Sequence, residues 1–254
     1  MKVLLFGATG MVGQGVLREC LRDPGVTQVV ALVRKPSGQT HAKLRELVHG
    51  DFFDYRAVEP DLTGLAACFF CLGVSAAGLG EAEYRRLTHD LTLAAAETLA
   101  RLNPAMTFVY VSGAGTDSTE QGRTMWARVK GRTENALRRL PFKAVYLFRP
   151  GLIQPLHGIR SRTGWYQAIY TLMRPAFPLL RRLFPKAILT TEELGRAMLR
   201  VAREGAPTAI LEAADLIVLG APPTRSAAPL PRAIRRRSSH PRPSRPPRGG
   251  RARG

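Results

Sequence analysis

Three glycines near the start of the chain have the spacing of a phosphate-binding turn. Residues 3–6 form an apolar run typical of a buried parallel strand, and Gly7, Gly10 and Gly13 lead from it into a helical apolar pattern. Such glycines permit the tight turn, the approach of a pyrophosphate and close helix–strand packing, and the helix N-terminus adds free N–H groups. Because the motif lies between a strand and a helix, it predicts a dinucleotide site. Its residues are Gly7, Thr9, Gly10, Met11, Val12 and Gly13.

A basic residue follows the second predicted strand, where the ribose of a dinucleotide would bind. The apolar segment 29–33 is followed by Arg34, Lys35, Pro36 and Ser37. NAD sites usually place Asp or Glu here, whereas Arg accommodates the 2′-phosphate of NADP. Arg34 therefore favours NADP over NAD, with Lys35 and Ser37 as helpers. A solvated basic turn is the alternative interpretation.

Strand and helix patterns alternate along most of the chain. The expected strands are 2–6, 28–33, 46–49, 66–72, 106–112, 143–149 and 208–213, and the expected helices are 11–23, 41–47, 81–102, 125–139 and 191–203. This alternation predicts an α/β fold, a doubly wound parallel sheet of the Rossmann type with helices on both faces.

Two further residues follow predicted strands. Asp51 comes after the third strand, where it could bond an adenine amino group, and Gly73 follows the fourth, where a glycine lets the backbone lie beside a cofactor. Ligands bind at the carboxyl ends of strands in such sheets. A simple turn is the alternative role for Asp51.

The composition divides the chain at residue 220. Residues 221–254 contain ten Arg, no Asp or Glu, and many Pro, Ser and Gly, so we expect a disordered tail. Residues 1–220 are then one domain, which keeps +9 of the formal charge of +19. A basic balance suits an anionic cofactor, nucleic acid or an anionic membrane. A tail without any evolved role is the alternative.

The cysteines and the N-terminus predict a location in the reducing cytoplasm. Strand one begins at once, which leaves no room for a signal peptide, and no apolar run reaches membrane-spanning length. Cys68 and Cys71 have C-x-x-C spacing but lie in an apolar strand pattern without a second Cys/His pair, so buried core thiols are expected rather than a metal or redox site.

Together, these residues resemble the short-chain dehydrogenase/reductase superfamily. The resemblance rests on the glycine motif, Arg34, Asp51, Ser112 and Lys130, covers about residues 1–215, and is strongest to an atypical branch of Tat-interacting-protein-like and NmrA-like proteins. It implies a Rossmann fold, NADP or NAD binding, and a function as a reductase, epimerase or redox sensor. It also implies that Pro150, in Arg149-Pro150-Gly151, flanks the nicotinamide carboxamide.

The catalytic motif departs from the superfamily pattern of Tyr-x-x-x-Lys with an upstream Ser. Ser112 and Lys130 match, but Trp126 occupies the tyrosine position. An indole N–H only donates and cannot act as a general acid or base. Lys130 could relay the proton itself, or another side chain could replace the tyrosine. Those considered are Tyr110, Tyr166 and His157.

Two local interpretations stay open on this helix. Trp126 either stacks on the nicotinamide or fills core. Lys130 either contacts the ribose or forms a surface pair with Glu134, which lies one turn further along the same face.

Residues 152–190 leave the strand–helix alternation and mix aromatic residues with Arg. They predict a small C-terminal cap that lines an apolar substrate pocket, with a membrane contact, a homodimer surface and ordinary packing as alternatives. The leading hypothesis is an NADP-dependent oxidoreductase for a small apolar carbonyl or enone, in which Ser112 positions the substrate. A catalytically silent NADP-binding sensor is the alternative.

The tail predicts binding to nucleic acid or anionic membrane by counterion release. Affinity for duplex DNA should fall steeply between low and physiological salt, and removal of residues 221–254 should abolish it. A shortened chain that binds DNA as well as the full chain would contradict this prediction.

Overall fold

The computed structural model describes residues 1–159, 177, 182–183 and 187–222. Met1–Pro222 form one compact unit. The predicted tail, most of the predicted cap and Tyr166 lie outside the described residues.

One sheet of seven parallel strands organises this unit, in the order β3-β2-β1-β4-β5-β6-β9. The six strands before β9 follow the Rossmann order 3-2-1-4-5-6, and the direction of winding reverses between β1 and β4. This confirms the predicted doubly wound α/β fold. The strands are β1 (Lys2–Phe6), β2 (Gln28–Val33), β3 (Leu44–Val48), β4 (Ala67–Phe70), β5 (Thr107–Val111), β6 (Ala144–Arg149) and β9 (Ile210–Glu212).

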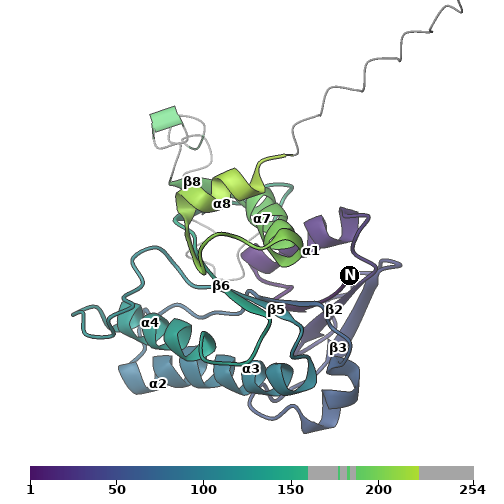
Figure 1. The fold of residues 1–254 in the computed structure, drawn as a ribbon, viewed down its shortest axis with the longest axis horizontal. Helices are drawn as coiled ribbons and strands as arrows, with labels where there is room; N and C mark the ends of the chain where they lie inside the picture. The colour runs from purple at the N-terminus through teal and green to yellow at the C-terminus, as the bar shows by residue number, and fades with distance from the viewer. Residues whose placement is uncertain (160–176, 178–181, 184–186, 223–254) are drawn as a thin grey trace, which may run out of the picture. The chain divides into compact units, whose positions relative to one another are not determined.

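Helices cover both faces of the sheet, as Figure 1 shows. One layer contains α1 (Met11–Arg22), α7 (Thr191–Glu204) and α8 (Ala213–Gly220); the other contains α2 (Glu81–Arg85), the π-helix η2 (Arg86–Asp90), α3 (Leu91–Leu102) and α4 (Met125–Leu137). A 3-10 helix, η1 (Arg56–Leu62), precedes β4. Among these described elements, no helix is long and apolar enough to cross a membrane.

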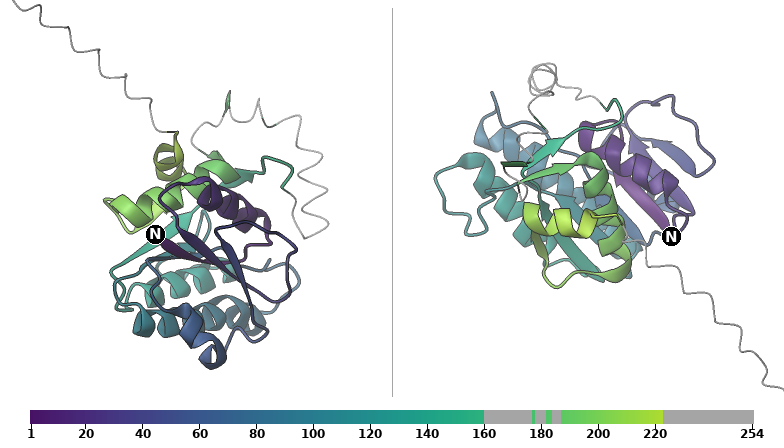
Figure 2. Two further views of the ribbon diagram at one scale, coloured as in Figure 1. Left: turned by 90° about the vertical axis from the view of Figure 1, so that its right-hand side faces the viewer. Right: turned by 90° about the horizontal axis from the view of Figure 1, so that it is seen from above.

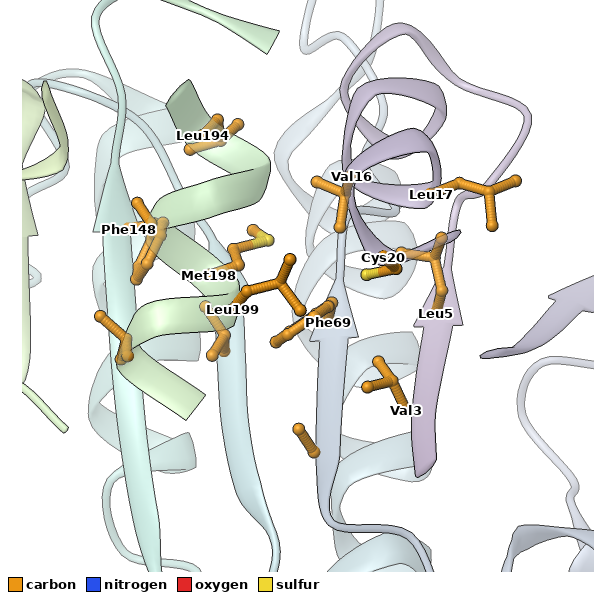
Figure 3. Close-up of a cluster of buried hydrophobic side chains, with 14 of the residues drawn as sticks. Val3, Leu5, Val16, Leu17, Cys20, Phe69, Phe148, Leu194, Met198 and Leu199 are labelled. Atoms are coloured by element: carbon orange, nitrogen blue, oxygen red, sulfur yellow. The ribbon is translucent and has the colours of Figure 1, made fainter. Parts of the chain in front are cut away.

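The central strands are almost entirely apolar, because both faces of the sheet are buried. Val3 and Leu5 point to one side, with Val16 of α1 and Met198 of α7, while Leu4 and Phe6 point to the other, with Leu99 of α3. Figure 3 shows the first of these clusters between α1, α7 and the sheet, and Figure 2 shows α7 beside α1 above the strands.

The structure corrects several predicted elements. The strand expected at 46–49 is present as the edge strand β3, but it begins at Leu44, so the helix expected at 41–47 is absent. The leucines of β3 are only half-buried, so the sequence lacks the continuous apolar run of a central strand. The helix expected at 81–102 is interrupted by η2. Helix α8 and a second, two-stranded sheet were not predicted from the sequence. The strands of that sheet are β7 (Leu152–Gln154) and β8 (Ile188–Thr190).

The cysteines are free, as expected for core thiols. Cys68 faces the α3 layer, whereas Cys71, three residues later, packs with Cys20 in the α1 layer. Burial raises the pKa of all three thiols. An odd separation along a strand places two side chains on opposite faces, so the C-x-x-C pair cannot act as one site.

The glycine turn allows α1 to approach the sheet closely. Gly7 has a φ of +74°, and a Cβ there would lie 2.7 Å from the carbonyl oxygen of Cys71 on β4's extension. A Cβ at Gly13 would lie 2.0 Å from the carbonyl oxygen of Gly7. Both contacts are with backbone, which cannot rotate away.

This contact predicts the effect of Gly13→Ala on stability. Helix propensity alone would stabilise the variant by about 1 kcal/mol, but the clash with Gly7 should reverse the sign and lower the free energy of unfolding by about 2 kcal/mol. Urea denaturation measures the change. Gly50→Ala, an exposed glycine with open space around its Cβ position, is the control and should stay within about 0.5 kcal/mol. Stabilisation by Gly13→Ala would show that α1 can move away freely.

Candidate functional site

A cavity of about 650 Å³ opens at the carboxyl ends of β1 and β2. The predicted residues Gly7, Thr9 and Arg34 line it. Other residues, which no sequence motif points to, also line this cavity: Ala8, Gln14, Leu17, Leu32, Val33, Pro36, Gln39, Phe52 and Leu72. The volume falls within the range of small-molecule sites, about 300–1,000 Å³.

The remaining residues of the glycine motif form the start of α1. The amide of Gly10 donates to the carbonyl of Gly7 at 2.9 Å, and Gln14 donates through its side chain to the carbonyl of Thr9 at 3.1 Å. Met11 and Val12 pack against the core beneath the turn. The motif therefore holds the helix N-terminus at the edge of the cavity, where its N–H groups favour an anion.

The basic segment after β2 forms the outer wall of the cavity. Arg34 and Lys35 are exposed there, as the sequence predicts. Ser37 also lines the cavity, but its hydroxyl and its amide both bond to Glu46 of β3, so this serine supports the loop.

Asp51 and Gly73 lie outside the lining of this cavity. The Asp51 carboxylate accepts from the amide of Phe53 at 2.9 Å and closes an exposed turn, which is the alternative role foreseen for it. The neighbouring Phe52 reaches the cavity instead. Gly73 is exposed after β4, with open space at its Cβ position.

A second group of predicted residues meets at the ends of β5 and β6. The Lys130 ammonium on α4 donates to the backbone carbonyl of Ser112 at 2.7 Å. The Ser112 and Thr116 hydroxyls are 2.9 Å apart, and Thr116 donates to the carbonyl of Gly113. Because Thr116 has a single hydroxyl hydrogen, Ser112 must be the donor in its bond with Thr116.

Pro150 is buried in the turn after β6, next to this group. Its carbonyl accepts from the amide of Ala114 at 3.0 Å, and the amide of Ser112 donates to the carbonyl of Phe148 at 2.8 Å. The two turns that carry Ser112 and Pro150 are thereby fixed to each other.

Burial lowers the pKa of Lys130 to about 8, and the nearby Glu134 carboxylate opposes this effect. The alternative interpretation, a surface pair between Lys130 and Glu134, is wrong, because Glu134 is fully buried and accepts bonds at both oxygens from Arg149. Glu134 does lie one turn after Lys130 on α4, but only the packing of α4 on the sheet shows that Glu134 points inward.

The candidates for the missing tyrosine lie in different places. Tyr110 is buried in the core on the α3 side, where desolvation raises its pKa, so it cannot serve this site. His157 lines a separate cavity beside α1 and pairs with Glu192 at 3.4 Å. Trp126 is half-buried, and its ring lies 3.6 Å from the Cβ position of Gly115 in the β5–α4 loop.

Solved structures of the same fold are similar to this chain. MoeE5 in complex with UDP-glucose and NAD has a TM-score of 0.60 and 18% identity, over 84% of this chain and 75% of that one. A short-chain dehydrogenase/reductase family oxidoreductase from Burkholderia thailandensis has a TM-score of 0.60 and 15% identity, over 85% of this chain and 92% of that one. At these identities the likeness shows the fold.

Sequence relatives have names that include a location. The mitochondrial protein fmp52 of Emericella nidulans is 32% identical over 59% of this chain, which spans 66% of that relative, just under two thirds of its length. FMP52 of Saccharomyces cerevisiae, also named mitochondrial, is 30% identical over 64% of this chain and 69% of its own length. These names contradict the predicted cytoplasmic location. The cytoplasmic location was predicted from the cysteines and from the strand at the N-terminus, and neither feature distinguishes one reducing compartment from another.

A family model described as NAD(P)H-binding matches residues 7–151. That range begins at the first glycine of the motif, contains Arg34, Ser112 and Lys130, and ends with the turn after β6. It covers more than half of the chain and agrees with the cavity at the glycine turn. The chain therefore belongs to the NAD(P)H-binding family of Rossmann oxidoreductase-like proteins, with the fmp52 proteins among its relatives.

Proposed function

We propose that this protein is an NADP-dependent oxidoreductase that transfers hydride to a small apolar carbonyl or enone and uses Lys130 in place of the usual tyrosine. The observation that carries the proposal is the bond from the Lys130 ammonium to the carbonyl of Ser112, at the carboxyl end of β5, on the same edge of the parallel sheet as the glycine turn. An amine with a pKa near 8 can both hold and release a proton at neutral pH.

The residues of the first cavity fit a dinucleotide. Backbone contacts exclude side chains at Gly7 and Gly13, which lets α1 lie close to the end of β1 and brings its N-terminal N–H groups to the cavity, where they would face a pyrophosphate. Arg34 and Lys35 supply two cations at the outer wall, where a 2′-phosphate would make charge-assisted hydrogen bonds. Lys130 and the Pro150 turn would then hold the ribose and carboxamide of the nicotinamide end, as the superfamily resemblance implies.

The bound cofactor would supply the hydride, and the protein's own groups would supply orientation and the proton. Rotation of the Ser112 hydroxyl away from Thr116 would turn its hydrogen toward a substrate carbonyl. The Lys130 ammonium would donate the proton to the developing alkoxide and recover it from solvent. The apolar character of the substrate rests on the composition of residues 152–190 alone.

Trp126 supports the alternative, a protein that binds NADP without turnover and acts through a partner. An indole cannot exchange a proton at this position. NADPH oxidation tested against a panel of quinones, aldehydes and enones separates the two functions. Tight NADPH binding without turnover of any of them would favour the alternative.

Arg34→Asp should weaken NADPH binding about 10- to 100-fold, since it removes a charge-assisted bond worth about 1.5–3 kcal/mol. NADH binding should change little, because NADH lacks the 2′-phosphate. Fluorescence titration measures both. Arg139→Asp, an equal charge change at an exposed site near the end of α4, is the control. Equal affinities for NADPH and NADH, unchanged by Arg34→Asp, would contradict NADP preference.

The pH dependence of carbonyl reduction tests Lys130. The ammonium form is the acid, so kcat/KM should be constant below the Lys130 pKa and fall as pH rises through about 8. Lys130→Arg keeps a charge but cannot release a proton at neutral pH, so turnover should drop by about 100-fold or more while NADPH still binds. An unchanged rate in Lys130→Arg would remove Lys130 from the chemistry.

A further inference from the structure

A buried ion pair lies directly behind the Lys130 site. Glu134 is fully buried on α4, one turn after Lys130, and Arg149 is the last residue of β6. The Arg149 Nε donates to Glu134 Oε1 at 3.0 Å, and its Nη2 donates to the other carboxylate oxygen. Both oxygens of Glu134 are therefore held in a bidentate pair, the geometry that gives such pairs their directional strength.

Arg149 connects this pair to two more parts of the structure. Its Nη2 also donates to the hydroxyl of Ser118 in the β5–α4 loop at 2.5 Å, and its Nη1 donates to Glu212 at the end of β9 at 3.3 Å. One guanidinium thus links α4, β6, β9 and the loop after Ser112. The residue that follows Arg149 is Pro150, so the pair joins the helix that carries Lys130 to the turn that carries Pro150.

We propose that Glu134 and Arg149 are a positioning unit for the proposed reaction, which sets the place and the charge of Lys130 from one helical turn away. The inference rests on the proposed function of Lys130 and adds Glu134 and Arg149 to the residues proposed for that site. Burying two charges costs free energy, and a pair of apolar residues would often stabilise a fold equally well. A buried pair is therefore weak evidence for stabilisation, and its position one helical turn from Lys130 is the ground for the proposed role.

The charges around Lys130 are few in the described part of the chain. Glu134, on the same helix, is the charged group that acts on Lys130. Arg149 of β6 and Glu212 of β9 lie behind Glu134, and Tyr110 of β5 also lies near Glu134, with its hydroxyl kept neutral by burial. Because Arg149 occupies both oxygens of Glu134, the carboxylate acts on Lys130 through its field and leaves the ammonium bonded to Ser112. Loss of the carboxylate should favour the neutral amine.

The test measures the charge of Lys130 without any turnover. The rate of acetylation of Lys130 by acetic anhydride is followed against pH by mass spectrometry of its peptide, in the full-length protein. In the wild type, the pH at which acetylation of Lys130 reaches half its maximal rate, the midpoint, should lie near 8. Glu134→Gln should move it down by about one pH unit. Glu120→Gln, which also removes a carboxylate paired with an α4 arginine, Arg132, should leave it unchanged.

Glu134→Gln leaves Arg149 buried beside a neutral side chain, which can prevent folding, so a second variant is needed that removes both charges. Glu134→Leu with Arg149→Met removes both charges and keeps apolar volume. It should fold, and because it removes the Arg149 cation together with the Glu134 carboxylate, it should lower the midpoint of Lys130 acetylation by less than Glu134→Gln does. Its kcat should fall at least about tenfold, with the pH limb of turnover displaced to lower pH.

The outcomes separate the inference from the proposed function. A midpoint that stays at the wild-type pH in folded variants would overturn the positioning role and leave a purely structural pair. A wild type that reduces no substrate would overturn the proposed reaction, while the acetylation midpoints would still decide whether Glu134 controls the charge of Lys130.

Discussion

The backbone of α1 touches the end of β1 through two glycines, and the rest of the site depends on that contact. Gly13 can lie against the carbonyl of Gly7 only because neither residue carries a side chain in the space between them. Gly7 in turn lies against the carbonyl of Cys71, so the same turn fixes the spacing between β1 and the segment after β4. The helix N-terminus is thereby held over the point where the sheet changes its direction of winding, which is where open α/β sheets bind ligands.

A different constraint holds the other end of the site. There the ion pair of Glu134 and Arg149, buried between α4 and the sheet, takes the role that glycines have at the first turn. Backbone contact allows no alternative geometry, whereas an ion pair fixes geometry and also supplies charge to its neighbours. The two ends therefore suit different tasks. The glycine end presents helix N–H groups, which favour an anion, and the ion-pair end lies one helical turn from an amine whose pKa is about 8.

The replacement of tyrosine by Trp126 removes one proton donor, and the buried environment of Lys130 offers another. Desolvation lowers the pKa of an amine because the charged form loses its hydration. The same α4 helix thus carries both the departure from the superfamily pattern and the group that could compensate for it. The small number of polar partners around Lys130 in the described residues makes its charge sensitive to any change at Glu134.

The sequence by itself determined the fold class, the glycine turn and the positions of Arg34, Ser112 and Lys130, because continuous apolar runs and glycine spacing are local signals. It determined β3 only in part, because the pattern predicts a helix at 41–47 and a strand at 46–49, and only the pairing with β2 shows that the strand begins at Leu44. It could not show that Phe52 rather than Asp51 reaches the cavity, or that Glu134 turns away from Lys130 toward Arg149, fifteen residues later. Those contacts join residues from different elements, and only the packing of helices on the sheet decides which side chains meet.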